Sequence, residues 1–289
     1  MDDVVNHDWT GRTEEVDDLI DPSQVARYAA TLGQAVAQPI ETLPPLWHWA
    51  FFQSPLDTAC LGDDGHPKEK AFLPPPANRS RMWAGGRVKF VEPLRVGIKA
   101  TRSSTIIKAQ EKTGSTGSLL FVTVQHDYIQ DGRLAISEEQ DIVFRALSPP
   151  KSGGSQRLIS GDWQETFVPS PVALFRYSAV TFNAHRIHYD EPYATAVEGY
   201  PGLVVQGPLI ATLTVAAFCR AHPDARLRHF AYRGLRPLIA PHAFEVGGRI
   251  TGAGIASTWA GNESGLAQSS EIHFEQFSST SGHCAAVGS

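Results

Sequence analysis

Residues 181–210 carry the side chains of this chain that are best suited to chemistry. Asn183, His185, His188 and Asp190 stand close together, and an apolar run follows a glycine at position 207. An imidazole can take up or release a proton near neutral pH. The first N–H groups of a helix have no partner inside the helix, so they can hold a developing oxyanion. The stretch therefore predicts a site that polarises a carbonyl group while it moves a proton.

The apolar run is predicted to be a buried helix. Residues 208–220 (PLIATLTVAAFCR) are apolar on nearly every face, which is typical of a helix enclosed by other elements. Gly207 and Pro208 fit its N-terminus, because proline is favoured in the first turn. A buried helix wrapped by an antiparallel sheet is the geometry of a hot-dog fold.

The order of segments indicates that one α+β unit occurs twice. A helix is expected near 21–30, with Asp21 or Ser23 as its cap, and another near 169–178. Segment 87–96 corresponds to 229–238, and each precedes three β-rich segments: 97–108, 119–129 and 141–145 in the first half, 243–250, 255–260 and 270–277 in the second. A Pro-, Gly- and Ser-rich connector at 147–155 separates the halves. We expect an α+β fold with two hot-dog domains, 1–146 and 156–289, each wrapped around a central helix.

Composition restricts the partners. The chain has 289 residues, is 42% hydrophobic and carries a formal net charge of −5, which argues against nucleic acid as a partner. No apolar run is long enough to span a membrane and no secretory signal is visible at the N-terminus. Cys60, Cys219 and Cys284 are far apart, which disfavours a disulfide scaffold or zinc site. A cytoplasmic protein is expected.

Three segments together resemble the MaoC-like hydratases and dehydratases: 182–190 (FNAHRIHYD), 202–207 (GLVVQG) and 232–238 (YRGLRPL). The similarity is strongest to the branch of mesaconyl-C4-CoA and itaconyl-CoA hydratases and mitochondrial hydroxyacyl-thioester dehydratases. Residues 81–86 (RMWAGG) also look like that branch. The resemblance implies a double hot-dog enzyme that needs no metal or redox cofactor, because the thioester of the acyl-CoA substrate is itself the electron sink.

The resemblance also implies roles for particular residues. In the wider family an Asp precedes a catalytic His by five residues, and here those positions are Asn183 and His188. Because Asn cannot ionise, His188 is the expected base, Asn183 orients the water or forms a turn, and His185 either takes part or shapes the loop. A replacement carboxylate is sought among Asp190, Glu191 and Glu198. Gly207 is expected to present the donor to the thioester oxygen, or else to let the helix pack closely.

Substrate contacts are expected from both halves. Arg81 and its neighbours Arg87 and Lys89 can meet a carboxylate or the phosphates of coenzyme A, or can form an ordinary solvated basic edge. The first half has no His-x-x-His string, so it is expected to complete the acyl tunnel without chemistry. The residues predicted to bind substrate are Arg81, Trp83, Gly85, Gly86, Tyr189, Asp190, Val205 and Gln206.

The predicted activity is reversible hydration of an enoyl-CoA, with a short branched dicarboxylic acyl group such as mesaconyl or itaconyl. Three alternatives stay open at this point: a dehydratase of 3-hydroxyacyl thioesters of fatty-acid type, a hot-dog thioesterase, and a non-catalytic acyl-binding subunit. A thioesterase would usually need a carboxylate where Asn183 stands. Two hot-dog units in one chain already form a pseudo-dimer, so both a monomer and a homodimer are open.

Overall fold

The computed structural model describes residues 4–5, 9–34, 40–68, 72–75, 79–114, 117–146 and 160–276. In the first half these form β1 (Val4–Val5), β2 (Thr13–Leu19), α1 (Pro22–Leu32), η1 (Trp47–Ala50), η2 (Thr58–Cys60), β3 (Arg79–Phe90), β4 (Lys99–Gly114), β5 (Gly117–Gln130) and β6 (Arg133–Ala146). In the second half they form β7 (Trp163–Phe167), α2 (Pro171–Val180), η3 (Arg186–His188), α3 (Glu191–Ala196), α4 (Gly207–Ala221), β8 (Ala225–Gly234), β9 (Phe244–Gly252), β10 (Ile255–Asn262) and β11 (Gly265–Gln276).

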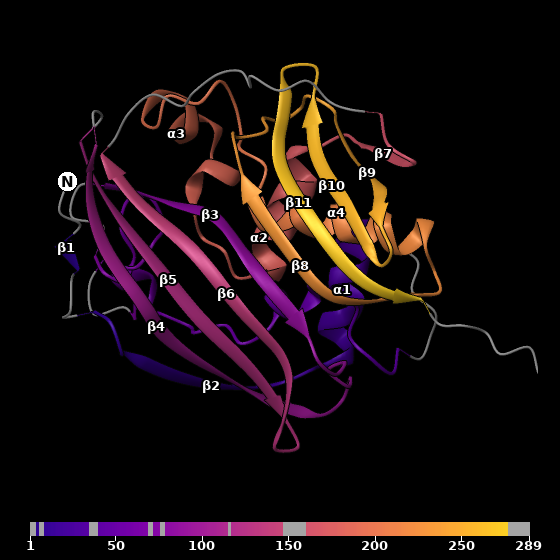
Figure 1. The fold of residues 1–289 in the computed structure, drawn as a ribbon. Helices are drawn as coiled ribbons and strands as arrows, with labels where there is room; N and C mark the ends of the chain where they lie inside the picture. Colours follow the sequence, from indigo (N-terminus) through magenta and orange to yellow (C-terminus); the bar gives the residue numbers. More distant parts are fainter. Residues whose placement is uncertain are drawn as a thin grey trace, which may run out of the picture.

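The strands of the two halves repeat the same arrangement (Figure 1). The described strands form one sheet in the order β1-β4-β5-β6-β3-β8-β11-β10-β9-β7, with β2 paired to β4. Each half thus contains four long antiparallel strands and a short strand on its outer member, β2 on β4 and β7 on β9. Strands β3 and β8 join the halves in register from Gly85–Arg233 to Lys89–His229. The predicted double hot-dog arrangement is confirmed.

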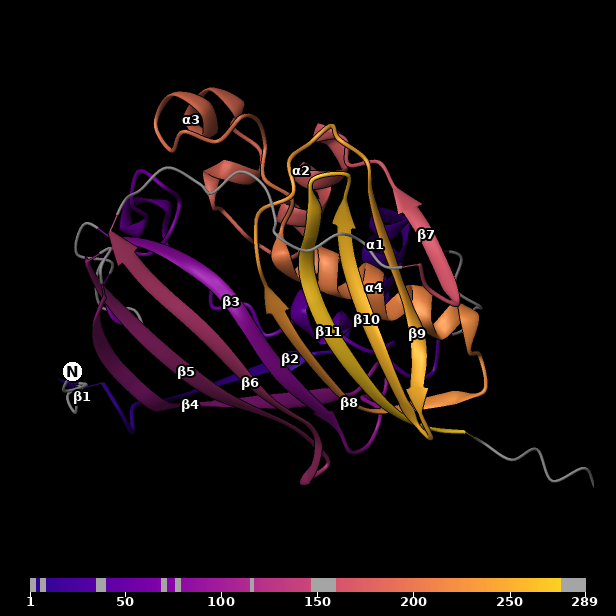
Figure 2. The same cartoon turned by 45° about the horizontal axis from the view of Figure 1, so that its top comes forward.

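Helix α4 lies against the strands of the second half, and the ends of the helices follow the expected chemistry. Helix α4 contacts β7, β8, β9 and β10, and nine of its residues are buried, as an all-round apolar helix requires (Figure 2). Helices α1 and α2 pack against each other where the halves meet, with Tyr28 and Tyr177 hydroxyls 3.3 Å apart. Asp21 and Ser170 cap these two helices, each followed by proline.

The first half departs from the expectation of a central helix in each half. Between α1 and β3, the described residues 40–68 and 72–75 contain only the short turns η1 and η2. Pro44 and Pro45 stand just before η1 and cannot donate the hydrogen bonds that a helix interior needs. The buried side chains of Trp47, Phe51 and Phe52 fill the space instead. The expectation is therefore corrected: of the two halves as described, the second has the long helix.

The predicted connector at 147–155 lies outside the described residues, so the domain limits 1–146 and 156–289 stay predictions. Strand β6 ends at Ala146 and β7 begins at Trp163. In the described part of the chain, no helix is long and apolar enough to cross a membrane.

Candidate active site

His188 is held in one protonation state by its surroundings. It ends η3, its side chain is buried, and its Nδ1 lies 2.7 Å from the Val204 carbonyl oxygen. A carbonyl oxygen only accepts, so Nδ1 carries the hydrogen and Nε2 keeps a free lone pair. Burial lowers the His188 pKa to about 4, against the opposing effect of the Val204 bond. The ring is therefore a neutral base at physiological pH.

Asn183 forms the turn that leads into η3. Its Oδ1 accepts a hydrogen bond from the His185 N–H at 3.0 Å, the pattern of an Asx turn. Its own N–H donates to the Ser178 oxygen at 2.8 Å. Within the described part of the chain, the side-chain Nδ2 has no partner. The amide can thus donate to a water or substrate oxygen while its carbonyl holds the loop.

The residues after His188 are occupied by contacts within their own loop. Asp190 accepts two hydrogen bonds from the Arg186 guanidinium and one from the Tyr193 N–H at the start of α3. The Tyr189 hydroxyl donates to the Ala184 carbonyl oxygen at 2.8 Å. Glu198, another candidate for the missing carboxylate, accepts from the Tyr193 hydroxyl at 3.3 Å. These contacts support the loop that carries His188, and a role in substrate binding stays a prediction.

The start of α4 lies close to His188 along the chain. Val204 accepts from His188, Val205 donates to the Leu238 oxygen, and Gln206 is fully buried with its Nε2 bonded to Leu174 and Ser178. The first hydrogen bond inside the helix runs from the Ile210 N–H to the Gln206 oxygen. The N–H groups of Gly207 and Leu209 precede it, so they have no partner inside the helix and point toward its positive end.

The stacked rings of Trp83 and Tyr232 form an aromatic wall, and its Trp83 ring lies against the start of α4. A Cβ on Gly207 would lie 2.6 Å from a ring carbon of Trp83, so the glycine lets the ring and the helix touch. Trp83 stacks on Tyr232 with ring centroids 4.5 Å apart. A Cβ on Gly85 or Gly86 would collide with the Tyr232 backbone oxygen or hydroxyl. Both glycines therefore allow β3 to pack closely on β8, and their role in substrate binding stays a prediction.

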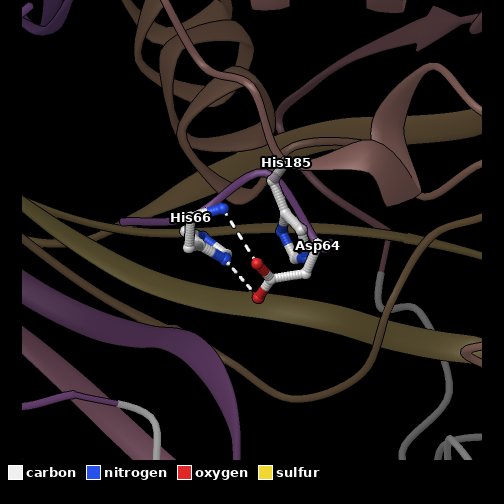
Figure 3. A group of neighbouring side chains, drawn as sticks. All are labelled: Asp64, His66 and His185. Carbon is white, nitrogen blue, oxygen red and sulfur yellow. Dashed lines mark hydrogen bonds and ion pairs between the residues drawn. The ribbon is translucent and has the colours of Figure 1, made fainter. Parts of the chain in front are cut away.

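The first half supplies a third imidazole and a carboxylate, which the sequence did not predict. Asp64 and His66 lie in the loop between η2 and β3, and their side chains point toward His185 (Figure 3). His66 Nδ1 lies 3.0 Å from Asp64 Oδ2, and the ring centroids of His66 and His185 are 4.2 Å apart. The ring centroids of His185 and His188 are in turn 5.2 Å apart. Three imidazoles from two halves of the chain thus form one row.

The charges of this row differ from group to group. The hydrogen bond from His66 holds the pKa of Asp64 well below its usual range, so Asp64 is an anion. Burial, together with the positive charges that His66 and His188 would carry, lowers the His185 pKa to about 2. His185 is therefore neutral and lies between a buried neutral base, His188, and an imidazole paired with a carboxylate.

Arg81 brings a positive charge to the same place. Burial lowers its pKa to about 10, opposed by the charge of Asp64, so the guanidinium stays protonated at neutral pH. In the described ranges it forms no hydrogen bond or ion pair. Its neighbour Arg87 is bound by Glu139 and Asp141. Of these two predicted cations, Arg81 is the one with donors to offer a ligand.

Asp64, His66 and His185 also form a group that could hold a metal ion, with ligand atoms within 4.8 Å of one another. Such an ion would have to replace the Asp64–His66 hydrogen bond. It would also face the positive charge of Arg81, which acts on both Asp64 and His185. That the site needs no metal stays a prediction.

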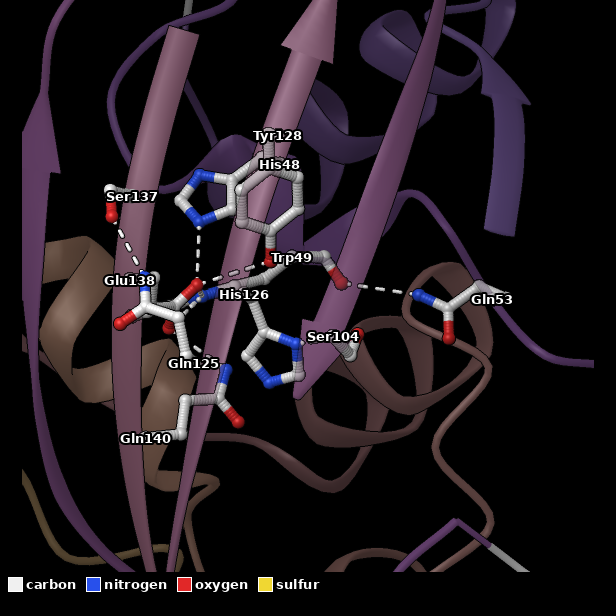
Figure 4. A network of polar contacts seen from close by, with 10 residues as sticks. All are labelled: His48, Trp49, Gln53, Ser104, Gln125, His126, Tyr128, Ser137, Glu138 and Gln140. Carbon is white, nitrogen blue, oxygen red and sulfur yellow. Dashed lines mark hydrogen bonds and ion pairs between the residues drawn. The ribbon is translucent and has the colours of Figure 1, made fainter. Parts of the chain in front are cut away.

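A buried polar network in the first half centres on Glu138 (Figure 4). Glu138 is fully buried and accepts from His48, Trp49, Tyr128 and Gln140 at 2.8–3.1 Å. Burial, the largest single effect, opposes its ionisation, but the hydrogen bonds from His48 and Gln140 and the charges of His48 and His126 together lower the pKa to about 2. The Trp49 ring meets Trp83 edge-on at 5.6 Å. Glu138 thus fixes Trp49, which packs on the wall beside Gly207.

A cavity of about 610 Å³ lies apart from the predicted site residues. It is bounded by the ends of α1 and α4 and by β7, with Leu32, Trp47, Phe167 and Cys219 in its lining. None of the predicted site residues lines it.

The fold and these groups define the class of protein. A neutral imidazole base, a helix start able to hold an oxyanion, and a double hot-dog fold together describe a hydro-lyase that acts on thioesters. The chain belongs to the family "Hydroxyacyl-thioester dehydratase type 2", whose pattern matches residues 46–240.

Named relatives agree with this assignment. The mesaconyl-C(4)-CoA hydratase of Chloroflexus aurantiacus is 43% identical over 249 residues, covering 84% of this chain and 89% of that protein. The mitochondrial hydroxyacyl-thioester dehydratase type 2 of Schizosaccharomyces pombe is 30% identical, covering 68% and 75%. The crystal structure of a MaoC-like dehydratase from Phytophthora capsici has the same fold, with a TM-score of 0.67, 14% identity and coverage of 93% and 97%.

Proposed function

We propose that this protein catalyses the reversible addition of water across the α,β double bond of an enoyl-CoA, with a short branched dicarboxylic acyl group as substrate. The observation that carries the proposal is the hydrogen bond between His188 Nδ1 and the Val204 oxygen. It leaves Nε2 free as a base and ties that base to the chain three residues before Gly207.

The proposed reaction follows from these two groups. The thioester oxygen accepts from the free N–H groups at the start of α4, which polarises the alkene and stabilises the enolate that forms. His188 Nε2 takes a proton from a water molecule as its oxygen bonds to the β-carbon. Asn183 Nδ2 donates to that water and holds it in place. The α-carbon then takes a proton, and the thioester is restored. No cofactor is required, because the thioester accepts the electron pair.

The dicarboxylic part of the proposal rests on Arg81. Its guanidinium lies in the field of Asp64 and His185 and has donors to offer, so it can bind a free carboxylate at the far end of a short acyl group. The name of the Chloroflexus relative, a mesaconyl-C(4)-CoA hydratase, supports the same substrate class.

The protein is assayed with a panel of mesaconyl-C4-CoA, itaconyl-CoA and crotonyl-CoA. Hydration is monitored as the loss of absorbance of the conjugated alkene. We expect hydration of a dicarboxylic substrate, and failure with all three would contradict the proposal. Preference for crotonyl-CoA would favour a dehydratase of fatty-acid type. Release of free thiol without loss of the alkene would identify a thioesterase. Turnover of none of them with binding of all three would indicate an acyl-binding subunit.

Arg81→Gln tests the carboxylate contact. We expect kcat/KM for the dicarboxylic substrate to fall by about 10- to 100-fold, the scale of one lost charged hydrogen bond, while crotonyl-CoA is little affected. Arg79→Gln is the matched control, because Arg79 lies on the same strand and is paired with Glu111. Equal losses for both substrates in Arg81→Gln would refute the contact.

A cytoplasmic location is also part of the proposal. The free thiols of Cys60 and Cys219 support a reducing compartment.

A further inference from the structure

We propose that the first half of the chain takes part in the chemistry: His66, paired with Asp64, is the second acid–base group of the site and delivers the proton to the α-carbon. This inference rests on the proposed hydration at the same site. It replaces the expectation that the first half only completes the acyl tunnel, and it supplies the carboxylate that the motif lacks at Asn183.

The first support is the geometry of the pair. Asp64 is an anion that only accepts, so His66 Nδ1 carries the hydrogen of their 3.0 Å bond. Asp64 Oδ1 also accepts from the His66 backbone N–H at 2.9 Å. These two bonds fix the ring and leave its Nε2 free for a proton. The carboxylate offsets the positive charge of a protonated ring, the arrangement that suits an imidazole acid.

The second support is that the chain holds this loop against the catalytic segment. The Arg186 backbone N–H donates to the backbone carbonyl oxygen of Asp64 at 3.0 Å. The Arg186 guanidinium donates to the backbone carbonyl oxygen of Asp63 at 2.8 Å. Gly65 has a φ of +88°, and a Cβ there would lie 1.8 Å from the Ala184 oxygen. Only glycine lets the two backbones approach this closely. The contact places Asp64 and His66 on the segment that carries His185 and His188.

The third support is the contrast between the two imidazoles. His188 is buried and neutral, which suits removal of a proton from water, whereas His66 is part-exposed and paired with a carboxylate. A buried neutral base and an imidazole whose positive form a neighbouring carboxylate can offset divide the roles of base and acid.

The step balances in protons and electrons. Water loses a proton to His188 Nε2 while its oxygen bonds to the β-carbon, and the alkene electron pair moves to the thioester oxygen. The enolate α-carbon then takes the proton from His66 Nε2, and the electron pair returns from oxygen to form the new C–H bond. His188 is left protonated and His66 neutral. His185, between the two rings, and solvent at the part-exposed side of His66 return the proton.

The test uses His66→Gln and Asp64→Asn, with His242→Gln on an exposed turn as the control. Glutamine can still donate to Asp64 but cannot carry a proton. We expect kcat to fall by about 10²- to 10⁴-fold in His66→Gln with KM little changed, as for loss of a general acid. In Asp64→Asn we expect kcat to fall at least about tenfold, because the His66 ring loses its carboxylate partner.

An isotope effect separates chemistry from structure. The hydration product of whichever panel substrate the wild type turns over is deuterated at the α-carbon and dehydrated. We expect the primary isotope effect on kcat to rise in His66→Gln and to stay unchanged in His242→Gln. Retention of kcat within about threefold in His66→Gln, or an unchanged isotope effect there, overturns the inference. If His66→Gln is thermally unstable, the same two readouts on Asp64→Asn decide. A wild type that hydrates none of the panel overturns the proposed function itself, which is a distinguishable result.

Discussion

At the scale of single residues, the site depends on which atoms are already engaged. His188 Nδ1 is bound to Val204, so only Nε2 can take part in chemistry. Asn183 shows the same division, with its carbonyl oxygen holding the turn and its amide nitrogen free to donate. The position where the wider family places a carboxylate is thus used for a turn and a donor, and the carboxylate comes from Asp64 instead.

Two substitutions at Asn183 separate its two roles. Asn183→Asp keeps an oxygen that accepts from the His185 N–H, so stability is expected to hold, whereas Asn183→Ala loses about 1 kcal/mol with that bond. Both remove the Nδ2 donor, so both are expected to lose about tenfold or more in kcat, the scale of one hydrogen bond to a reacting group. Thermal unfolding measures the stability of both variants, and steady-state hydration kinetics measure their kcat. A gain of activity in Asn183→Asp would show that the position requires a carboxylate.

At the scale of elements, the site is assembled by loops that two halves of the chain bring together. The turn η3 positions His188, α4 supplies its free N–H groups, and the loop before β3 adds Asp64 and His66. Arg186 binds that loop through two backbone oxygens. The loop contact is therefore expected to matter for catalysis as well as for stability.

Gly65→Ala tests this contact against a matched control. Gly11 has the same φ of +88°, but nothing lies within 4 Å of its Cβ position, so Gly11→Ala measures the backbone strain alone. We expect Gly65→Ala to lose more stability than Gly11→Ala, and to lose about 10²-fold or more in kcat if His66 moves away. Equal stability and full activity in both variants would contradict the docked loop. Chemical unfolding and hydration rates provide the readouts.

At the scale of the whole molecule, several buried histidines make stability depend on pH. Burial lowers the pKa of His126 and His188 to about 4 and of His185 to about 2, from an ordinary value near 6.5. The unfolded chain therefore binds protons below pH 6.5 that the folded chain does not. Stability is full above pH 6.5 and is lost as the pH falls toward 4.

Denaturant unfolding between pH 7 and pH 4.5 measures this loss. We expect the unfolding free energy to fall by about 1.4 kcal/mol for each pH unit and each such histidine. His126 lies in a network away from His188. In His126→Gln we expect the slope of unfolding free energy against pH to fall by the contribution of one histidine. An unfolding free energy that is constant over this range would contradict the buried neutral state of these rings.

Much of the architecture could be predicted from local patterns. The all-round apolar run at 208–220 identified α4, and the similar order of segments identified the duplicated fold. The first half has no equivalent helix among its described residues, and buried aromatic side chains pack around η1 instead. That difference depends on packing, which no local pattern displays.

The catalytic groups were predictable from one segment of the second half, and Arg81 and Trp83 from the first half were expected as substrate contacts. His188, Asn183 and Gly207 share one segment, so their spacing reveals them. Asp64 and His66 lie more than a hundred positions earlier, and the only local signal was the string Asp63-Asp64-Gly65-His66. The roles of Gly85 and Gly86 depend on the register of β3 against β8, which places Tyr232 beneath them.

The central claim is that His188 is the base for hydration of an enoyl-CoA. The most direct measurement compares kcat for hydration in the wild type and in His188→Gln, whose amide can still donate to the Val204 oxygen. We predict that the wild-type rate does not fall as the pH is lowered from 8 to 6, since the pKa of His188 is about 4, and we predict a loss of about 10²- to 10⁴-fold in His188→Gln. A variant that keeps its fold and retains kcat within about threefold would contradict the account.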